Sequence, residues 1–361
     1  MNMLVATMKI TDSAVFSEDR FTFEVGEREI IATKQQRDAL GLKWYVDGNL
    51  GVIKSGDRYV MYGANGSSPY RVTGTFLNHF EKVEPVKIIS SDSTFRYMAG
   101  GPLFLDPESK RILLFYHAEV YRGDAKNFYS VLGLSIQTDD AGLIFNDLGP
   151  VFSANIPEEK AMYPTEICGA PYILKDGYFY VYARDEFLTG EPRQSNLSVA
   201  RAKVSEVLKN SRKGQRVRWK KYYDGDFSEP ANGGRSTPLE EGNPRTRWMD
   251  LSYNTEIGKY IMVAATTNAG SEETKAELCV TWSDDGIYWA KRVRLVDEGG
   301  ECFYPSIIGL QDSPRQTGKT FFIYYTFSEK GAWDRWGDAV IVRRKVTVRY
   351  PDKQQDAPTH R

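Results

Sequence analysis

The chain has 361 residues, of which 41% are hydrophobic and 13% aromatic, and its 47 basic and 48 acidic residues leave a formal net charge of -1. This length supplies material for a large core, while the interspersed charges create no overall field that would attract nucleic acid or a membrane surface. The three cysteines show neither the even count of a disulfide framework nor the spacing of metal ligands, so we expect no cofactor and no bound metal.

The first 40 residues contain one predicted strand, residues 21–25, followed by polar sequence that we expect to be irregular. Met1 to Lys9 lack the basic region and long apolar run of a signal peptide, and no segment reaches the roughly 18 uninterrupted apolar residues of a membrane span. We expect a soluble protein. Its location, cytoplasmic or exported with a signal that this chain does not contain, is open, as is its oligomeric state.

From residue 47 onward, a unit of roughly 50 residues recurs along the chain. Each unit has three or four runs of β-branched and aromatic residues separated by turn residues, which predicts an antiparallel meander. The third unit shows this best: Lys175-Asp176-Gly177 is a turn between predicted strands at 170–174 and 178–184, and a short helix is predicted at 204–210. The five units cover approximately residues 47–90, 98–153, 166–230, 248–297 and 301–350.

A four-stranded meander repeated in this way is typical of a β-propeller, so the sequence predicts an all-β, five-bladed propeller in a single domain of residues 1–361. The fifth unit has only three predicted strands. We therefore expect residues 1–40 to supply its fourth strand, which would close the ring and cover an exposed sheet edge. The competing interpretation is a β-sandwich, whose strands repeat less regularly.

Two turns resemble the Asp-box, a Ser/Thr-x-Asp-x-Gly-x-x-Trp/Phe motif. Residues 138–145 fit this spacing with the acid at Asp140, and residues 283–289 contain the same motif one residue shorter. In such a turn the polar side chains bond backbone amides, glycine adopts a positive φ, and the aromatic ring packs under the hairpin. We assign these motifs a structural role, on the face opposite the starts of the first strands.

The starts of the first strands should lie together at one end of the ring, which we call the front face. Four of the five starts carry an acid, namely Asp47, Glu166, Asp250 and Glu301, whereas the second unit has Gly100-Gly101 there. Converging carboxylates raise at least one pKa, which is how a site keeps one acid protonated and another ionised for glycoside hydrolysis. Any one of these acids could instead cap a turn.

The ends of the second strands reach the same face and add further candidates. His117 could be a general acid or a hydrogen-bonded strand residue, and Arg184 could hold a carboxylate or phosphate, or form an ion pair with Asp185 or with an acid in the channel. Tryptophans near the unit starts could stack on sugar rings or wedge neighbouring blades. The predicted substrate-binding residues are His117, Glu119, Arg184, Glu301, Trp248 and Trp333, and the predicted catalytic residues are Asp47, Glu166 and Asp250.

Over residues 44–350 the chain resembles the five-bladed propeller glycosidases, the group that includes the family 43 arabinofuranosidases and xylosidases. The resemblance lies in the repeat pattern and in the acid Glu166 ahead of the strands around Lys175-Asp176-Gly177. It implies that Asp47 is the general base and Glu166 the general acid. The second-blade Asp of that group is absent, so its role as pKa modulator would fall to Asp250 or Glu119.

These observations predict a glycoside hydrolase with a carbohydrate substrate. We expect a pentose or furanoside type of glycan and an inverting mechanism, with the carboxyls of Asp47 and Glu166 roughly 6.5–9.5 Å apart. One alternative is a phosphorolytic propeller enzyme acting on a mannoside, in which Arg184 would hold phosphate. The other is a sugar-binding propeller without catalytic activity.

Overall fold

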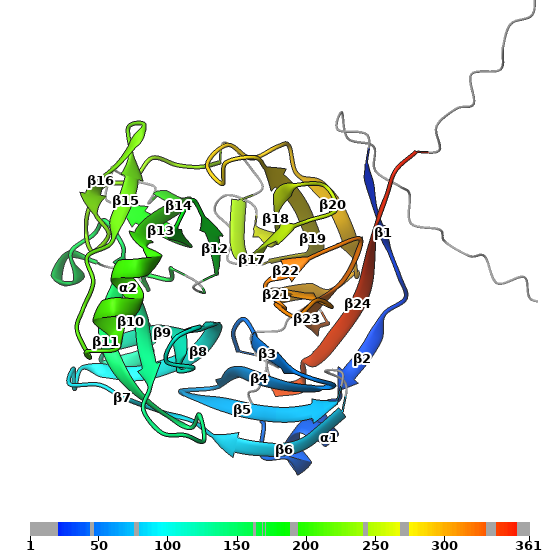
Figure 1. The fold of residues 1–361 in the computed structure, drawn as a ribbon, viewed down its shortest axis with the longest axis horizontal. Helices are drawn as coiled ribbons and strands as arrows, with labels where there is room; N and C mark the ends of the chain where they lie inside the picture. The colour runs from blue at the N-terminus through cyan, green and yellow to red at the C-terminus, as the bar shows by residue number, and fades with distance from the viewer. Residues whose placement is uncertain are drawn as a thin grey trace, which may run out of the picture.

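A computed structural model shows five antiparallel sheets arranged around a central axis, with the first strand of each sheet innermost (Figure 1). The five-bladed β-propeller predicted from the sequence is confirmed. Among the described residues, no helix combines the length and the hydropathy that crossing a membrane requires. The structure describes residues 21–43, 47–75, 79–161, 164–167, 169, 171–187, 194–240, 245–267, 274–329 and 337–351.

Blades one and two are joined by a strand that changes sheet. β7 (Lys87–Ile89) follows blade one in the chain but pairs in parallel with the last strand of blade two. The first sheet ends at Pro85, since proline has no amide hydrogen to continue the ladder. Blade one contains β3 (Gly51–Ser55), β4 (Arg58–Asn65), β5 (Ser68–Thr75) and β6 (His79–Pro85). Blade two contains β8 (Phe95–Leu105), β9 (Ile112–Arg122), β10 (Asp124–Gln137) and β11 (Ile144–Ser153).

Blade three contains the predicted tight hairpin and the predicted helix. Asp176 and Gly177 have φ values of +49° and +76°, and positive values at both central residues characterise the type I′ turn that matches strand twist. A 3-10 turn, Glu158–Lys160, precedes the blade, and α2 (Val204–Ser211) packs Val207 and Leu208 into the core. The strands are β12 (Tyr172–Lys175), β13 (Tyr178–Phe187), β14 (Gln194–Lys203), β15 (Lys220–Tyr223) and β16 (Asp226–Pro230).

Blades four and five are also linked by a crossing strand, because β22 (Gln316–Thr317) leaves blade five and pairs in parallel with the first strand of blade four. Blade four consists of β17 (Arg245–Asn254), β18 (Lys259–Thr267), β19 (Thr274–Ser283) and β20 (Val293–Asp297). Blade five has β21 (Glu301–Gly309), β23 (Thr320–Ser328) and β24 (Val340–Arg349).

The N-terminal segment closes the ring, as predicted. β1 (Thr22–Val25) runs antiparallel to β24, with Phe23 opposite Val348. The sequence after residue 25 is not irregular, however, because β2 (Glu29–Ala32) also pairs with β24 and α1 (Lys34–Ala39) follows it. A capping box starts this helix: Gln36 N donates to Thr33 Oγ1 at 3.2 Å, and Thr33 N donates to Gln36 Oε1 at 2.9 Å.

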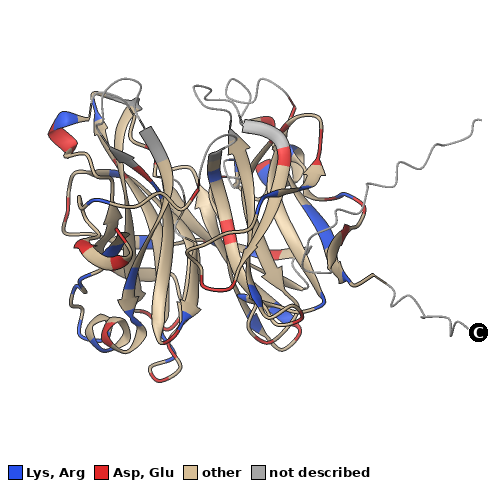
Figure 2. Ribbon diagram, turned by 90° about the horizontal axis from the view of Figure 1, so that it is seen from above, with Lys and Arg blue, Asp and Glu red and all other residues tan. Residues whose placement is uncertain are grey.

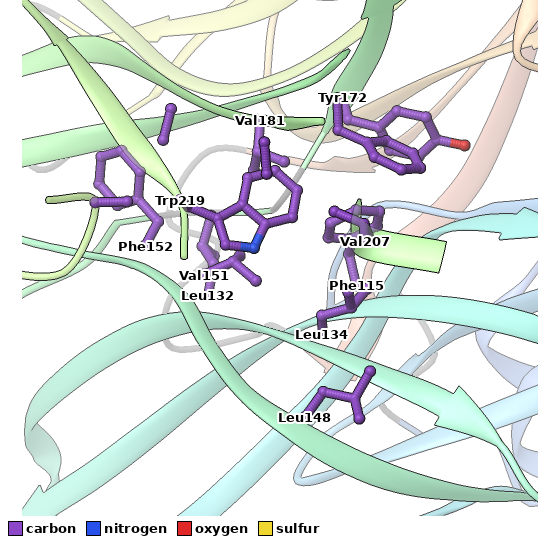
Figure 3. Packing of buried hydrophobic residues seen from close by; sticks show 14 of the residues in the cluster. Phe115, Leu132, Leu134, Leu148, Val151, Phe152, Tyr172, Val181, Val207 and Trp219 are labelled. Carbon is purple, nitrogen blue, oxygen red and sulfur yellow. The ribbon is translucent and has the colours of Figure 1, made fainter. Parts of the chain in front are cut away.

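Each pair of neighbouring blades encloses its own cluster of buried apolar side chains. Figure 3 shows the cluster between blades two and three, where the Trp219 ring lies among Val151, Phe152 and Val181. Charged positions of both signs are interspersed over the outside of the ring (Figure 2). Neighbouring blades are therefore held face to face by apolar contacts.

The two Asp-box turns lie at the end of the ring opposite the front face, which we call the back face. In blade four, Ser283 Oγ accepts from Gly286 N at 2.8 Å and Asp285 Oδ1 from Ile287 N at 2.8 Å. In blade two the acid is Asp139, not Asp140: Leu143 N and Ile144 N donate to Asp139 Oδ1 at 3.0 and 2.9 Å. Asp140 instead projects, fully exposed, beside Arg111.

Each box is also tied to the preceding blade by a buried tyrosine. Tyr62 Oη of β4 donates to the carbonyl of Gly142 at 2.8 Å, and Tyr182 Oη of β13 donates to that of Gly286 at 2.7 Å. Both glycines have positive φ, +72° and +76°. The boxes thus fasten blade one to blade two and blade three to blade four.

Candidate active site

A pocket opens at the front face, where blades one, two, three and five meet. Of the residues predicted from the sequence, it brings together Asp47, His117, Glu119 and Glu166, and it adds Tyr97 and Tyr304, which the sequence analysis missed. None of the described lining residues is Lys or Arg. The pocket is therefore rich in carboxylates and hydroxyls and suits a neutral polar ligand better than an anion.

Asp47 lies ahead of β3, in contact with two tyrosine hydroxyls from different blades. Tyr97 Oη donates to its Oδ2 at 2.6 Å and Tyr304 Oη to its Oδ1 at 3.1 Å. Burial raises the pKa of Asp47 to about 6, although the two hydroxyls oppose this rise. Gly48 beside it has a φ of +142°, a conformation that side chains rarely adopt.

His117 and Glu119 project from β9 on the same side, because residues two apart on a strand share a face. His117 Nε2 lies 3.2 Å from Glu119 Oε1, and His117 Nδ1 lies 3.8 Å from Glu166 Oε1. The imidazole therefore stands between two carboxylates, one at each ring nitrogen. Glu119 and burial also raise the pKa of Tyr121 to about 12.

The same three side chains are the candidates for a metal site within the described part of the chain. Their ligand atoms lie within 4.8 Å of one another. However, the two carboxylates lie nearest to different nitrogens of His117, whereas an ion bound to one nitrogen would draw both acids to that side. The geometry fits hydrogen bonding through the imidazole better than metal coordination.

Glu166 is held in place by the backbone on either side of it. Thr165 pairs with β10, where its carbonyl accepts from Ser130 N at 3.0 Å, and Ile167 N donates to Ser130 Oγ at 3.0 Å. Arg184 N of β13 donates to the carbonyl of Ile167 at 3.1 Å. The loop that carries Glu166 is therefore fixed to blades two and three, and the main chain of Arg184 contributes to this.

Asp250 does not line the pocket. The sequence placed it at the start of the first strand of blade four, but β17 begins at Arg245, so Asp250 lies in mid-strand and is fully buried. Arg315 Nη1 donates to both of its oxygens at 2.9 Å, and Ile307 N donates to Oδ2 at 2.8 Å. Burial raises its pKa while the guanidinium lowers it. This carboxylate is bound by a cation and main-chain amides inside the protein.

Two other predicted ligand contacts, Trp248 and Glu301, lie away from the pocket lining. Trp248 is 1% exposed and packs against the rings of Phe303 and Tyr304, with centroids 4.9 and 4.8 Å away, so it wedges blades four and five together. Glu301 is buried as the first residue of β21, outside the pocket lining. Trp333 lies outside the described residues.

In the described part of the chain, the cation that pairs with Asp185 is Lys221, where the sequence suggested Arg184. Asp185 is buried and accepts instead from Lys221 Nζ at 2.6 Å, Ser236 Oγ at 2.7 Å and Asn155 N at 2.7 Å. Arg184 is not among the residues that line the pocket. Adjacent residues of a strand face opposite sides, which separates the two side chains.

Gly100 and Gly101, which the sequence placed at the start of the inner strand of blade two, lie in the middle of β8, where this strand passes close to blade one. A Cβ on Gly51 of blade one would collide with the carbonyl oxygen of Gly101, and a Cβ on Gly100 would lie 2.9 Å from the Cβ of Pro69. The inner strands of blades one and two thus approach main chain to main chain. Tyr97, three residues before Gly100 on β8, reaches Asp47 from this blade instead.

No protein-family model and no curated protein sequence matches the chain. Among solved structures, it resembles the catalytic domain of the Coprinopsis cinerea GH62 α-L-arabinofuranosidase, with 8% identity, 91% of this chain and 98% of the other covered, and a TM-score of 0.55. A family 117 glycoside hydrolase from Zobellia galactanivorans gives 11% identity, 90% coverage of each chain and a TM-score of 0.52. A further glycoside hydrolase gives 11% identity, 88% and 91% coverage and a TM-score of 0.53. At these identities the likeness establishes the propeller fold.

Proposed function

We propose that the protein is a glycoside hydrolase in which Asp47 is the general base and Glu166 the general acid. The observation that carries the proposal is that these two carboxylates, from the starts of blades one and three, both line one pocket. Glycoside hydrolysis requires such a pair on opposite sides of the scissile bond. The fold likeness to three glycoside hydrolases supports the same reaction class.

In this mechanism Asp47 removes a proton from a water molecule while Glu166 protonates the departing glycosidic oxygen. With a pKa of about 6, Asp47 is ionised at neutral pH and can accept that proton. His117, which stands between Glu166 and Glu119, would orient the Glu166 carboxyl and stabilise its charge after proton transfer. Glu119 thereby takes the modulating part that a second-blade Asp has in the family 43 group.

The pair should act with inversion. Blades one and three are not neighbours in a five-membered ring, so their carboxylates approach the substrate from opposite sides. Inverting enzymes need roughly 6.5–9.5 Å between the two carboxyls to accommodate water, whereas retaining enzymes need about 5–5.5 Å. Proton NMR of the first-formed anomer distinguishes the two mechanisms.

A neutral sugar of the pentose or furanoside type is the proposed substrate. One of the similar structures is an α-L-arabinofuranosidase by its description. The described lining of the pocket contains carboxylates but neither Lys nor Arg, which disfavours anionic sugars and also the phosphate that a mannoside phosphorylase would bind. Hydrolysis is therefore preferred to phosphorolysis.

A panel of chromogenic arabinofuranosides, xylosides and mannosides, assayed with and without phosphate, tests the proposal. Hydrolysis of a pentoside that does not depend on phosphate is expected. Glu166→Gln should lower turnover about 10²–10⁴-fold for poor leaving groups and much less for activated ones, whereas Asp47→Asn should impair both. Asp176→Asn, in an exposed turn on the back face, is the control.

Other outcomes would replace the proposal. Mannoside cleavage that requires phosphate would indicate a phosphorylase. Sugar binding without turnover in any assay would indicate a binding propeller. Full activity of the Glu166→Gln variant on poor leaving groups would remove Glu166 from the acid role.

A further inference from the structure

Tyr304 has a backbone conformation that tyrosine seldom adopts. Its φ is +48°, and it precedes Pro305, a position that normally favours extended backbone. The other described non-glycine residues with positive φ, Lys110, Asp176 and Asp224, lie in turns between strands. Tyr304 instead lies inside β21, at a bulge between Phe303 and Ser306. Strain within a strand persists only where its surroundings impose it, and it is typical of functional sites.

The surroundings of this bulge do impose it. Asn49 Nδ2 donates to the carbonyl of Pro305 at 2.7 Å, and Leu50 N donates to Ser306 Oγ at 3.0 Å. The buried Trp248 packs on the Tyr304 ring at 4.8 Å. Asp250, through Ile307 N, fixes the strand just beyond. Trp248 and Asp250, which the sequence analysis placed in the site itself, thus instead support the segment that carries Tyr304.

The consequence of the strained conformation is a hydroxyl placed on Asp47. Tyr304 donates to Oδ1 from blade five, and Tyr97 donates to Oδ2 from blade two, so each oxygen of the carboxylate receives one hydroxyl from the blade on either side of blade one. We infer that Tyr304 and Tyr97 are positioning residues that fix the orientation of the Asp47 carboxylate for catalysis. This inference rests on the proposed role of Asp47 as the base.

Hydroxyl donors suit a base better than a cation does. Each carboxylate oxygen has two lone-pair sites, so one remains on each for a water molecule. A neutral donor also leaves the negative charge in place, unlike Arg315 on Asp250. The groups that face Asp47 are Tyr97 of β8, His117 and Glu119 of β9, and Tyr304 of β21; the tyrosines and His117 lower its pKa, whereas burial and Glu119 raise it.

The pH dependence of kcat/KM in Tyr304→Phe and Tyr97→Phe tests the inference, because removing either hydroxyl destabilises the ionised carboxylate. The acid limb should move to higher pH by about one unit, and more for Tyr97, whose bond is shorter. The loss of activity is thus larger at pH 6 than at pH 8. Tyr182→Phe removes a buried hydroxyl at the back face and should leave the limb unmoved.

A second readout needs no substrate. The difference in unfolding free energy between each Tyr→Phe variant and its Asp47→Asn double variant, followed against pH, reports the ionisation of Asp47 directly. Its midpoint should move in the same direction as the acid limb. If Tyr304→Phe does not fold, Tyr97→Phe provides the same test from another blade.

Different results would overturn the positioning role of the tyrosines and the role of Asp47 as the base. An inactive Asp47→Asn variant together with unmoved midpoints in both Tyr→Phe variants would overturn the positioning role and leave the base intact. An active Asp47→Asn variant would overturn the proposed base. The free-energy midpoints would still show whether the hydroxyls stabilise the carboxylate.

Discussion

The acids of the front pocket and those of the back face differ in what they bond. Asp47 receives two neutral hydroxyls, and burial raises its pKa to about 6. Asp106, at the back end of the inner strand of blade two, receives Arg212 Nε and Nη2 at 2.6 and 2.7 Å together with a backbone amide, and its pKa lies well below the usual range because of Arg212. Residue type alone does not separate these two carboxylates.

The difference shows what makes a buried acid available for chemistry. Asp106, Asp185 and Asp250 are each bound by a cation and by main-chain amides, so their oxygens are occupied and their role is structural, although burial still raises the pKa of Asp250. Asp47 is stabilised only enough to ionise near neutrality. A carboxylate with neutral partners keeps its basicity, whereas one with a cationic partner contributes to stability.

The largest expected effect of this difference is on activity at low pH. Because Asp47 must be ionised to act as a base and its pKa is about 6, kcat/KM should fall about 100-fold between pH 6.5 and pH 4. Asp106 remains ionised over this range, so circular dichroism should show an intact fold at pH 4. A flat pH profile down to pH 4, with the fold intact, would contradict the role given to Asp47.

The next largest expected effect is the loss of stability when the ion pair between Asp106 and Arg212 on the back face is broken. Asp106→Ala removes the buried partner of Arg212, which keeps only the exposed Glu108 as an ion-pair partner among the described contacts, and the free energy of unfolding should fall by about 2–3 kcal/mol, measured by urea denaturation. Because the pKa of Asp106 is lowered by folding, its contribution is present above about pH 4 and is lost as the pH falls through the folded-state pKa. Turnover per folded molecule should not change, and a drop in turnover would show that the two faces are coupled.

The contribution of Asp47 to the unfolding free energy should depend on pH in the opposite direction to that of Asp106. Folding raises the pKa of Asp47, so its contribution is favourable below about pH 4 and is lost as the pH rises through about 6. Relative to wild type, Asp47→Asn should therefore gain about 2 kcal/mol of unfolding free energy between pH 4 and pH 8 while losing activity. A difference that is constant with pH would mean that the pKa of Asp47 is not raised.

The sequence predicted the architecture well because the strands of each blade are mostly consecutive in the chain. Runs of β-branched and aromatic residues, turn residues such as Asp176-Gly177 and the strand missing from the fifth unit were sufficient for the ring and its closure. The crossing strands β7 and β22 were missed, because parallel pairing with a neighbouring blade leaves no local pattern. Hydrogen bonds between blades depend on the assembled ring.

The site was predicted only in part, for reasons of register and conformation. An acid near a strand start faces the pocket or the core depending on where the strand begins, and β17 begins five residues before Asp250. Tyr97 reads as an ordinary aromatic strand residue. Tyr304 reaches Asp47 only through a positive φ before proline, which sequence preferences argue against.

The smallest of these effects concerns the first Asp-box, where the spacing selected the wrong one of two adjacent acids. Asp139→Ala removes the acceptor for two turn amides and should cost about 1–2 kcal/mol, whereas Asp140→Ala, at an exposed site, should change the unfolding free energy by less than about 0.5 kcal/mol. The second box supplies a matched pair in which the third position is the acceptor. There Asp285→Ala should destabilise and Asp284→Ala should not.

Thermal and urea unfolding measure the change in unfolding free energy of the four variants, and the pH dependence of kcat/KM serves as the control for the front pocket. None of the four should move the acid limb of kcat/KM, because the boxes lie at the end of the ring opposite the pocket. If Asp140→Ala proved as destabilising as Asp139→Ala, the turn would be held by the acid at the motif spacing and the blade-two box would match that of blade four. If instead the effects follow Asp139 and Asp285, then backbone geometry, rather than the position in the motif, decides which acid binds the turn amides.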